Sequence, residues 1–301
     1  MPDRTTVPSV RARKRASGSE PIVMVTAYDT PTAAAADTGG VDIVLVGDSM
    51  ANVVLGYPDT LHVDVATMAH HVGAVHRAGT RALVVADMPW LSYHLEPTDA
   101  VRNAAVLVRA GAEAVKLEGG AARVPAIRAI VAAEIPVMGH LGLTPQSVHA
   151  MGGYRVQARD DAAAAALVDD ARALQAAGCF AVVLEGVPDV AAAAVTDALS
   201  IPTIGIGAGP ACDGQVLVFH DLVGYGTARP AKFVRRYAEL FDMASAAVAA
   251  WAADVRAGSF PADAETYHAV DRGPAPAPGA AAEPASPGDR PPGGGAPPPV
   301  G

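Results

Sequence analysis

The ten residues VDIVLVGDSM, at positions 41–50, point to the architecture of the whole chain. The run at 43–46 is apolar and rich in β-branched residues, which predicts a parallel strand covered on both faces. Gly47 ends this strand, and Asp48 and Ser49 follow at its C-terminal end. In α/β barrels, chemically active groups gather at that end of the strands, so Asp48 and Ser49 are candidate site residues.

Seven more apolar runs alternate with helix-forming segments along the chain. These further strands are expected at residues 21–27, 81–86, 112–117, 135–138, 180–184, 202–206 and 216–219. Eight strands that alternate with helices predict an α/β fold, a (β/α)8 TIM barrel. The link from residue 206 to residue 216 is short for a crossover between parallel strands. Either a single helical turn closes this link, or the eighth strand is misplaced.

Composition divides the chain into three regions. Residues 1–19 are polar and basic and form an N-terminal extension, with a short helix expected at 7–15. Residues 20–268 form the barrel, which ends in a helix expected at 232–256. Residues 269–301 contain few large apolar groups among their Pro, Gly and Ala, so we expect a disordered tail.

The overall composition argues against several classes of protein. The net charge is −9 and no basic stripe is present, so nucleic-acid binding is not expected. Two cysteines, Cys179 and Cys212, are too few for a disulfide framework or a four-cysteine metal site. No apolar run reaches the ~18 residues of a membrane span, and no secretory signal pattern is visible. We therefore expect a cytoplasmic protein without a membrane partner.

Five neighbouring strands are followed or ended by an ionisable side chain. These residues are Asp48, Asp87, Glu118, His140 and Glu185. One carboxylate at a strand end often only caps the next helix, but four carboxylates at one rim would repel one another unless they were paired. Hard oxygen ligands without clustered Cys or His favour Mg²⁺ over Zn²⁺. The candidate ligands are Asp48, Asp87 and Glu118, some of them through water.

The sequence around Lys116 indicates chemistry on a 2-oxo acid. Lys116 and Glu118 are two residues apart on one strand and face the same side, so Lys116 could hold an anionic group or simply pair with Glu118. A metal ion that polarises the ketone would ease removal of a neighbouring proton. Glu185 is the candidate base, or else a salt-bridge partner at the rim. His140 could orient a ligand or assist proton movement, although a structural role fits equally well.

Two loops add weaker signals. Residues 141–160 form the longest connection without clear periodicity, and the pair Gly152 and Gly153 predicts a mobile lid. The glycines at 205–209 follow the seventh strand, where barrels often bind phosphate, but tight packing explains them equally well.

Seven motifs, in order along the chain, carry a resemblance to a known family. They are VLVGDSM (44–50), ADMPW (86–90), VKLEGG (115–120), GHLGLTPQSV (139–148), GGYRVQ (152–157), VLEGVP (183–188) and IPTIGIGAG (201–209). From about residue 21 to about residue 268 the chain resembles ketopantoate hydroxymethyltransferase. One departure is Ala158, where the family pattern has a glycine.

The resemblance implies a decameric barrel that uses Mg²⁺ and 5,10-methylenetetrahydrofolate to add a hydroxymethyl group to 3-methyl-2-oxobutanoate, giving ketopantoate in pantothenate biosynthesis. It implies that Asp48, Asp87 and Glu118 form the metal site, and that Glu185 accepts the proton during Mg²⁺-assisted enolate formation. The implied 2-oxo acid site consists of Asp48, Ser49, Asp87 and Lys116. Two alternatives stay open: a related lyase that cleaves a carbon–carbon bond, and a catalytically silent barrel, which would have lost these carboxylates.

Overall fold

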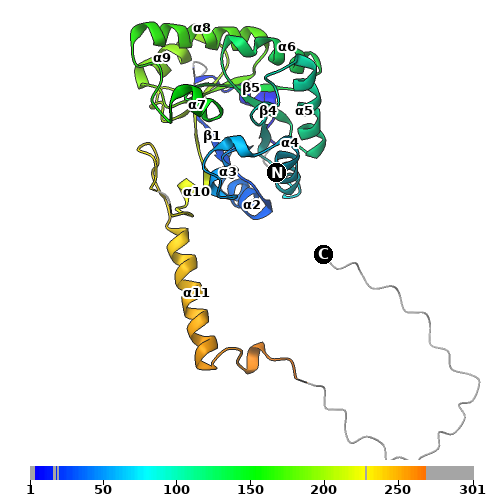
Figure 1. Ribbon diagram of the computed structural model, residues 1–301, viewed down its shortest axis with the longest axis vertical. Helices are drawn as coiled ribbons and strands as arrows, with labels where there is room; N and C mark the ends of the chain where they lie inside the picture. Colours follow the sequence, from blue (N-terminus) through cyan, green and yellow to red (C-terminus); the bar gives the residue numbers. More distant parts are fainter. Residues whose placement is uncertain (1–3, 16–17, 19, 228, 269–301) are drawn as a thin grey trace, which may run out of the picture. The chain divides into compact units, whose positions relative to one another are not determined.

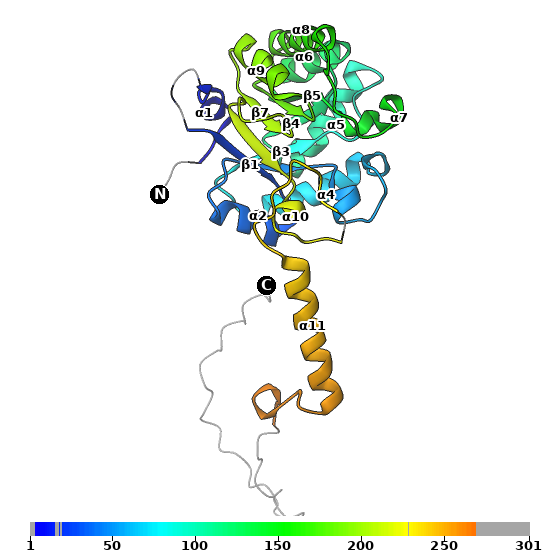
Figure 2. The same cartoon turned by 90° about the vertical axis from the view of Figure 1, so that its left-hand side faces the viewer.

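Eight parallel strands close into a barrel in the computed structural model, which describes residues 4–15, 18, 20–227 and 229–268 (Figures 1 and 2). The strands are β1 (Ile22–Thr26), β2 (Ile43–Val46), β3 (Leu83–Asp87), β4 (Ala114–Glu118), β5 (Val137–Gly142), β6 (Ala181–Glu185), β7 (Thr203–Ile206) and β8 (Gly214–Leu217). Each strand pairs with the next, and β8 pairs with β1. The (β/α)8 prediction is therefore confirmed.

Helices cover the outside of the strands. The longer ones are α2 (Thr30–Thr38), α4 (Val65–His76), α5 (Pro97–Ala110), α6 (Val124–Ala132), α8 (Asp161–Ala177) and α9 (Asp189–Ala198). Short helices are α1 (Val7–Arg11), α3 (Met50–Val53), α7 (Val148–Met151) and α10 (Phe219–Leu222), with 3₁₀ turns at η2 (Thr60–His62), η3 (Ala121–Arg123) and η4 (Pro145–Ser147). Asp29 caps α2 by accepting the Thr32 N–H, and α5 begins with a proline at Pro97.

The period of two along each strand divides the core into two layers. Ile43 and Leu45 belong to the apolar cluster inside the barrel, whereas Val44 and Val46 belong to the cluster between strands and helices. Val10 of α1 is fully buried and joins the inner cluster beside residues from the starts of the strands. Helix α1 therefore covers the N-terminal end of the barrel and leaves the C-terminal end for the polar groups.

Two predicted boundaries in the last third of the barrel are wrong. Strand β8 begins at Gly214, where a Cβ would lie 2.4 Å from the carbonyl oxygen of Ile22, so a glycine starts the strand and hides it from an apolar pattern. No helical turn closes the link from β7. The final helix, α11 (Leu240–Ala257), begins eight residues later than expected, since Tyr237 N–H donates to Leu222 and holds the preceding segment against α10.

The chain divides into two compact units, Met1–Ala246 and Ala247–Gly301. The described part of the second unit holds the end of α11 and the 3₁₀ turn η5 (Asp263–Glu265), and the Trp251 ring meets the Phe260 ring edge-on. The tail expected at residues 269–301 lies outside the described residues. Over the described ranges, the helices are all too short or too polar to cross a membrane.

Candidate active site

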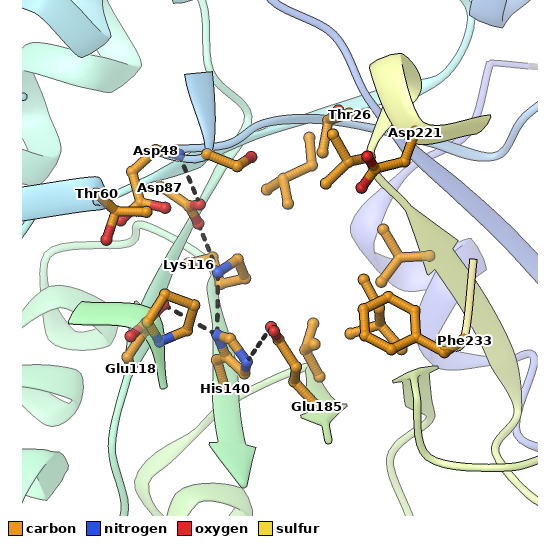
Figure 3. Close-up of a pocket in the computed structure, with 17 residues that line it drawn as sticks. Thr26, Asp48, Thr60, Asp87, Lys116, Glu118, His140, Glu185, Asp221 and Phe233 are labelled. Carbon is orange, nitrogen blue, oxygen red and sulfur yellow. Dashed lines mark hydrogen bonds and ion pairs between the residues drawn. The ribbon is translucent and has the colours of Figure 1, made fainter. Parts of the chain in front are cut away.

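A pocket of about 200 Å³ opens at the C-terminal ends of the strands (Figure 3). Every side chain that the sequence singled out lines it, namely Asp48, Ser49, Asp87, Lys116, Glu118, His140 and Glu185. The strand registers bring these groups together, since Asp87 lies opposite Lys116 and Glu118 lies opposite His140 on neighbouring strands. The residues far apart in sequence thus converge on one cavity.

Asp87 ends β3 and contacts residues from both neighbouring strand ends, β2 and β4. Its Oδ1 lies 2.8 Å from Nζ of Lys116, and its Oδ2 accepts the backbone N–H of Asp48 at 3.0 Å. Burial opposes the charge on Lys116, but attraction to Asp87 and Glu118 outweighs it and raises the lysine pKa above its ordinary value. Burial raises the pKa of Asp87, although Lys116 counteracts this. Lys116 is therefore a fixed cation beside the acidic groups.

Asp48 is a buried carboxylate that lies close to two other carboxylates. The residue is 4% exposed, and burial, together with the charges of Asp87 and Glu118, raises its pKa well above the ordinary value. Gln146 donates from Nε2 to its Oδ2 at 2.8 Å. An added positive charge at this wall would stabilise the charged form of Asp48.

His140 lies between two carboxylates. Its Nδ1 is 3.3 Å from Glu118 Oε1, and its Nε2 is 3.3 Å from Glu185 Oε2 (Figure 3). Burial and Lys116 disfavour its charged form, but Glu118 and Glu185 outweigh them and raise the His140 pKa to about 9. Burial raises the pKa of Glu118, yet the contact with His140 is the next largest influence and the net shift is downward. The ring therefore bridges Glu118 and Glu185, and Lys116 Nζ lies 3.3 Å from its Nδ1.

The side of the pocket formed by Asp48, Asp87 and Glu118 offers carboxylate oxygens, which are the ligands that Mg²⁺ prefers. Within the residues that the structure describes, no three His, Cys, Asp or Glu side chains already enclose a metal position. Mg²⁺ usually takes one or two protein carboxylates and completes its shell with water and substrate oxygens. Asp48 and Asp87 fit that requirement, because both are buried at the pocket wall and repel one another. Glu118 lies at the same wall, where its carboxylate contacts His140 and the backbone N–H of Gln146.

Sequence reasoning missed part of the pocket lining. Thr26 occupies the inward position at the end of β1, and the period of two could have found it. Asp221 also lines the pocket and follows the strand expected at 216–219 by two residues, so the strand-end signal could have found it. Phe233 lines the pocket too, but it comes from a segment without such a signal. Gln146 and Tyr93 lie behind the wall and touch Asp48 or Glu118, which no local pattern indicates.

The two loops with weaker signals have different structures. At Gly209, a Cβ would lie 2.5 Å from the Asp189 Cβ, which favours the tight-packing explanation for the glycine-rich stretch. In the expected lid, Gly152 and Gly153 have positive φ and open space around the missing Cβ. Ala158 has φ of 53°, a left-handed conformation that favours glycine, the residue that the resemblance leads us to expect there.

Comparisons with solved structures support the fold. The chain is similar to phosphonopyruvate hydrolase in complex with oxalate and Mg²⁺, with 16% identity, a TM-score of 0.56, and coverage of 87% of this chain and 91% of that one. It is also similar to 2,3-dimethylmalate lyase, with 21% identity, a TM-score of 0.56, and coverage of 88% and 93%. At such identities the likeness shows a shared barrel and nothing finer.

Comparisons of sequence are more specific. A 3-methyl-2-oxobutanoate hydroxymethyltransferase of Methylobacterium sp. (strain 4-46) is 58% identical over 262 residues, 87% of this chain and 90% of that protein. One of Moorella thermoacetica is 55% identical over 260 residues, 86% and 96% of the two chains. The family model described as ketopantoate hydroxymethyltransferase matches residues 4–263. The chain therefore belongs to the ketopantoate hydroxymethyltransferase family.

Proposed function

We propose that this protein transfers a hydroxymethyl group from 5,10-methylenetetrahydrofolate to 3-methyl-2-oxobutanoate in pantothenate biosynthesis. Relatives that are 51–58% identical and carry the name 3-methyl-2-oxobutanoate hydroxymethyltransferase support the reaction. The observation that carries the proposal is the pocket itself, where a carboxylate pair, a lysine and a separate glutamate meet. In the balanced reaction, folate donor, 2-oxo acid and one water give tetrahydrofolate and 2-dehydropantoate, with a new bond to C3.

We assign the ion-holding role to Asp48 and Asp87, with Glu118 acting indirectly through its contacts with His140 and Gln146. Mg²⁺, when bound, would stabilise negative charge that develops on the 2-oxo group of the substrate. Lys116 would bind the substrate carboxylate as a fixed point charge. Ser49 would donate its hydroxyl to a substrate oxygen, since it lines the pocket next to Asp48.

Glu185 would remove the C3 proton of the 2-oxo acid, and the electron pair left on C3 would then form the bond to the one-carbon unit. Its carboxylate is the more accessible one, with 17% of the side chain exposed against 3% for Glu118. His140 stands 3.3 Å from Glu185 and would hold that carboxylate in place. Because Glu185 is not one of the two proposed metal ligands, Asp48 and Asp87, its carboxylate stays available to accept a proton from the substrate.

Two alternatives are less well supported. A lyase that cleaves a carbon–carbon bond would share the barrel, but the likeness to the structure of 2,3-dimethylmalate lyase is at 21% identity and extends to the fold alone. A silent barrel has no reason to keep five carboxylates in one cavity, where repulsion and burial destabilise it.

Turnover decides among these proposals. We expect 3-methyl-2-oxobutanoate and methylenetetrahydrofolate to be converted to 2-dehydropantoate, with activity lost in EDTA and restored by added Mg²⁺. Cleavage of the 2-oxo acid instead of transfer would favour the lyase, and no reaction at all would favour the silent barrel. We also propose a cytoplasmic homodecamer, which cell fractionation and light scattering after size-exclusion chromatography would test.

A further inference from the structure

Gln146 connects two acidic groups that no strand pairing joins. Its side-chain Nε2 donates to Asp48 Oδ2 at 2.8 Å and to the Met88 carbonyl at 2.9 Å, while its backbone N–H donates to Glu118 Oε2 at 3.0 Å. Asp48 follows β2 and Glu118 ends β4, with β3 between them. Gln146 reaches both from η4, beyond the end of β5.

Tyr93 fixes which way the Gln146 amide points. The Tyr93 hydroxyl accepts the backbone N–H of Glu118 at 3.1 Å and lies 2.6 Å from Gln146 Oε1. Because the hydroxyl has one hydrogen and Oε1 can only accept, that hydrogen goes to the amide oxygen. The NH₂ group must then face Asp48 and Met88, and both of its hydrogens have acceptors. The orientation of the Gln146 amide is therefore assigned from all of these hydrogen bonds together.

Neither Gln146 nor Tyr93 lines the pocket, and both are buried, at 5% and 2% exposure. They can therefore influence a bound molecule only through the groups that they hold. Among the residues that the structure describes, Gln146 is the one side chain that hydrogen-bonds the Asp48 carboxylate. Without it, Asp48 would be free to rotate at a wall where burial and Asp87 already disfavour its charge.

We propose that Gln146, oriented by Tyr93, is a positioning residue that locks the Asp48 carboxylate and ties it to Glu118, so that a divalent cation meets a preformed site. This inference rests on the proposed function, since it takes Asp48 as an ion-holding group. Partners that orient metal ligands are typically worth about 10–100-fold in metal affinity or activity. The effect should therefore appear in cation binding without substrate or turnover.

The test is Mn²⁺ binding to substrate-free protein, followed by the loss of the free-ion electron paramagnetic resonance signal. Gln146→Met keeps most of the side-chain volume but removes every amide hydrogen bond, and we expect the Mn²⁺ Kd to rise about 10–100-fold. Tyr93→Phe should give a smaller rise. The double variant should bind no more weakly than Gln146→Met, because both residues act through the same contact.

Thr196→Val is the matched control. It breaks a buried hydroxyl pair with Thr203, 2.7 Å apart, at the start of β7 and outside the pocket lining. We expect a lower unfolding temperature with an unchanged Mn²⁺ Kd, which separates positioning from general loss of packing.

A wild-type Kd in folded Gln146→Met protein would overturn the inference and leave the proposed function standing. If Gln146→Met does not fold, Tyr93→Phe decides: a raised Kd supports the inference and an unchanged one overturns it. Wild-type protein that turns over substrates but binds no Mn²⁺ or Mg²⁺ would overturn this inference and the metal role of Asp48 together.

Discussion

Glu185 and Asp87 are both carboxylates at strand ends, but their surroundings suit them to different tasks. Asp87 is almost fully buried and forms an ion pair with Lys116 at 2.8 Å. Glu185 is partly exposed and has an imidazole nitrogen 3.3 Å from its carboxylate. A carboxylate buried against a lysine ammonium is a weak base, whereas a carboxylate that is open to the cavity can reach a substrate and take its proton. Each assignment makes a separate prediction.

Glu185→Gln should stop proton removal while leaving binding nearly intact. Glutamine keeps the shape of the side chain but has no carboxylate, and a positioned base typically contributes about 10²–10⁴-fold. We expect deuterium exchange at C3 of 3-methyl-2-oxobutanoate, followed by NMR with Mg²⁺ present, to slow by that amount. Calorimetry should show near-normal affinity for the 2-oxo acid. Exchange at the original rate would show that another group is the base.

Asp87→Asn should raise the Mg²⁺ concentration needed for activity. The amide keeps an oxygen for the Asp48 N–H but removes the negative charge, leaving Lys116 to repel the cation. Loss of one charged ligand should shift the half-saturating Mg²⁺ concentration at least about tenfold. Asp99→Asn on the exposed face of α5 is the control, since it removes a charge far from the pocket lining. Equal Mg²⁺ curves for both variants would remove Asp87 from the ligand set.

Among the elements, β5 ends at a glycine that positions the proposed base. Gly142 lies opposite Glu185 in the β5–β6 register and has φ of 91°. A Cβ there would lie 2.3 Å from the carbonyl oxygen of Glu185 and 2.7 Å from Val187 Cγ1. Any larger residue at 142 must therefore push the backbone that carries Glu185.

Gly142→Ala should lower both stability and activity. The left-handed backbone alone costs an L-residue about 1–2 kcal/mol, and the clash adds to that cost. Gly56→Ala is the matched control, because Gly56 has φ of 75° but nothing within 4 Å of the added Cβ. We expect urea unfolding to show a larger loss at 142, with turnover reduced only there. Similar losses and similar turnover would mean that the clash relaxes without moving Glu185.

At the end of α2, Asp37 accepts the backbone N–H groups of Arg81 and Ala82 just ahead of β3. Burial raises the pKa of Asp37, but these hydrogen bonds outweigh it and hold the pKa below its ordinary value of 3.8. A lowered folded pKa gives stability that is complete above the unfolded pKa and lost as pH falls through the folded one. The unfolding free-energy difference between wild type and Asp37→Asn should therefore shrink on acidification from about pH 6 to about pH 2. A constant difference would contradict this.

The elements also show what a sequence can predict. The run at 43–46 is the observed β2, because a strand buried on both faces needs continuous apolar residues. The catalytic candidates were recoverable for the same reason, since each follows or ends such a run. The roles of Gly214 and Gln146 could not be predicted, because tertiary structure sets them. Gly214 lies against the backbone of Ile22, and Gln146 hydrogen-bonds Asp48 from a loop beyond β5. Their roles depend on residues distant in sequence.

In the molecule as a whole, the barrel closes where β8 pairs with β1. Asp213 lies just before β8 and is completely buried. It accepts hydrogen bonds from the Lys14 ammonium at 2.8 Å, from the Arg15 N–H at 2.7 Å and from the Thr203 N–H at 2.8 Å. One carboxylate thus joins the N-terminal segment, β7 and β8 at the end of the barrel opposite the pocket.

Asp213→Ala should destabilise the protein strongly without changing the turnover of folded protein. Removing one partner of a buried ion pair leaves the other charge and several donors unsatisfied, which typically costs about 3–5 kcal/mol. The exposed pair of Asp99 and Arg102, 3.4 Å apart on α5, is the control, and Asp99→Ala should change stability by less than about 1 kcal/mol. Urea unfolding measures both variants, and turnover is compared at a temperature where both are folded. Because stability resides at the N-terminal end of such a barrel and chemistry at the other, Asp213→Ala protein that stays folded should keep wild-type turnover. A loss of turnover without a loss of stability would show that the two ends are coupled.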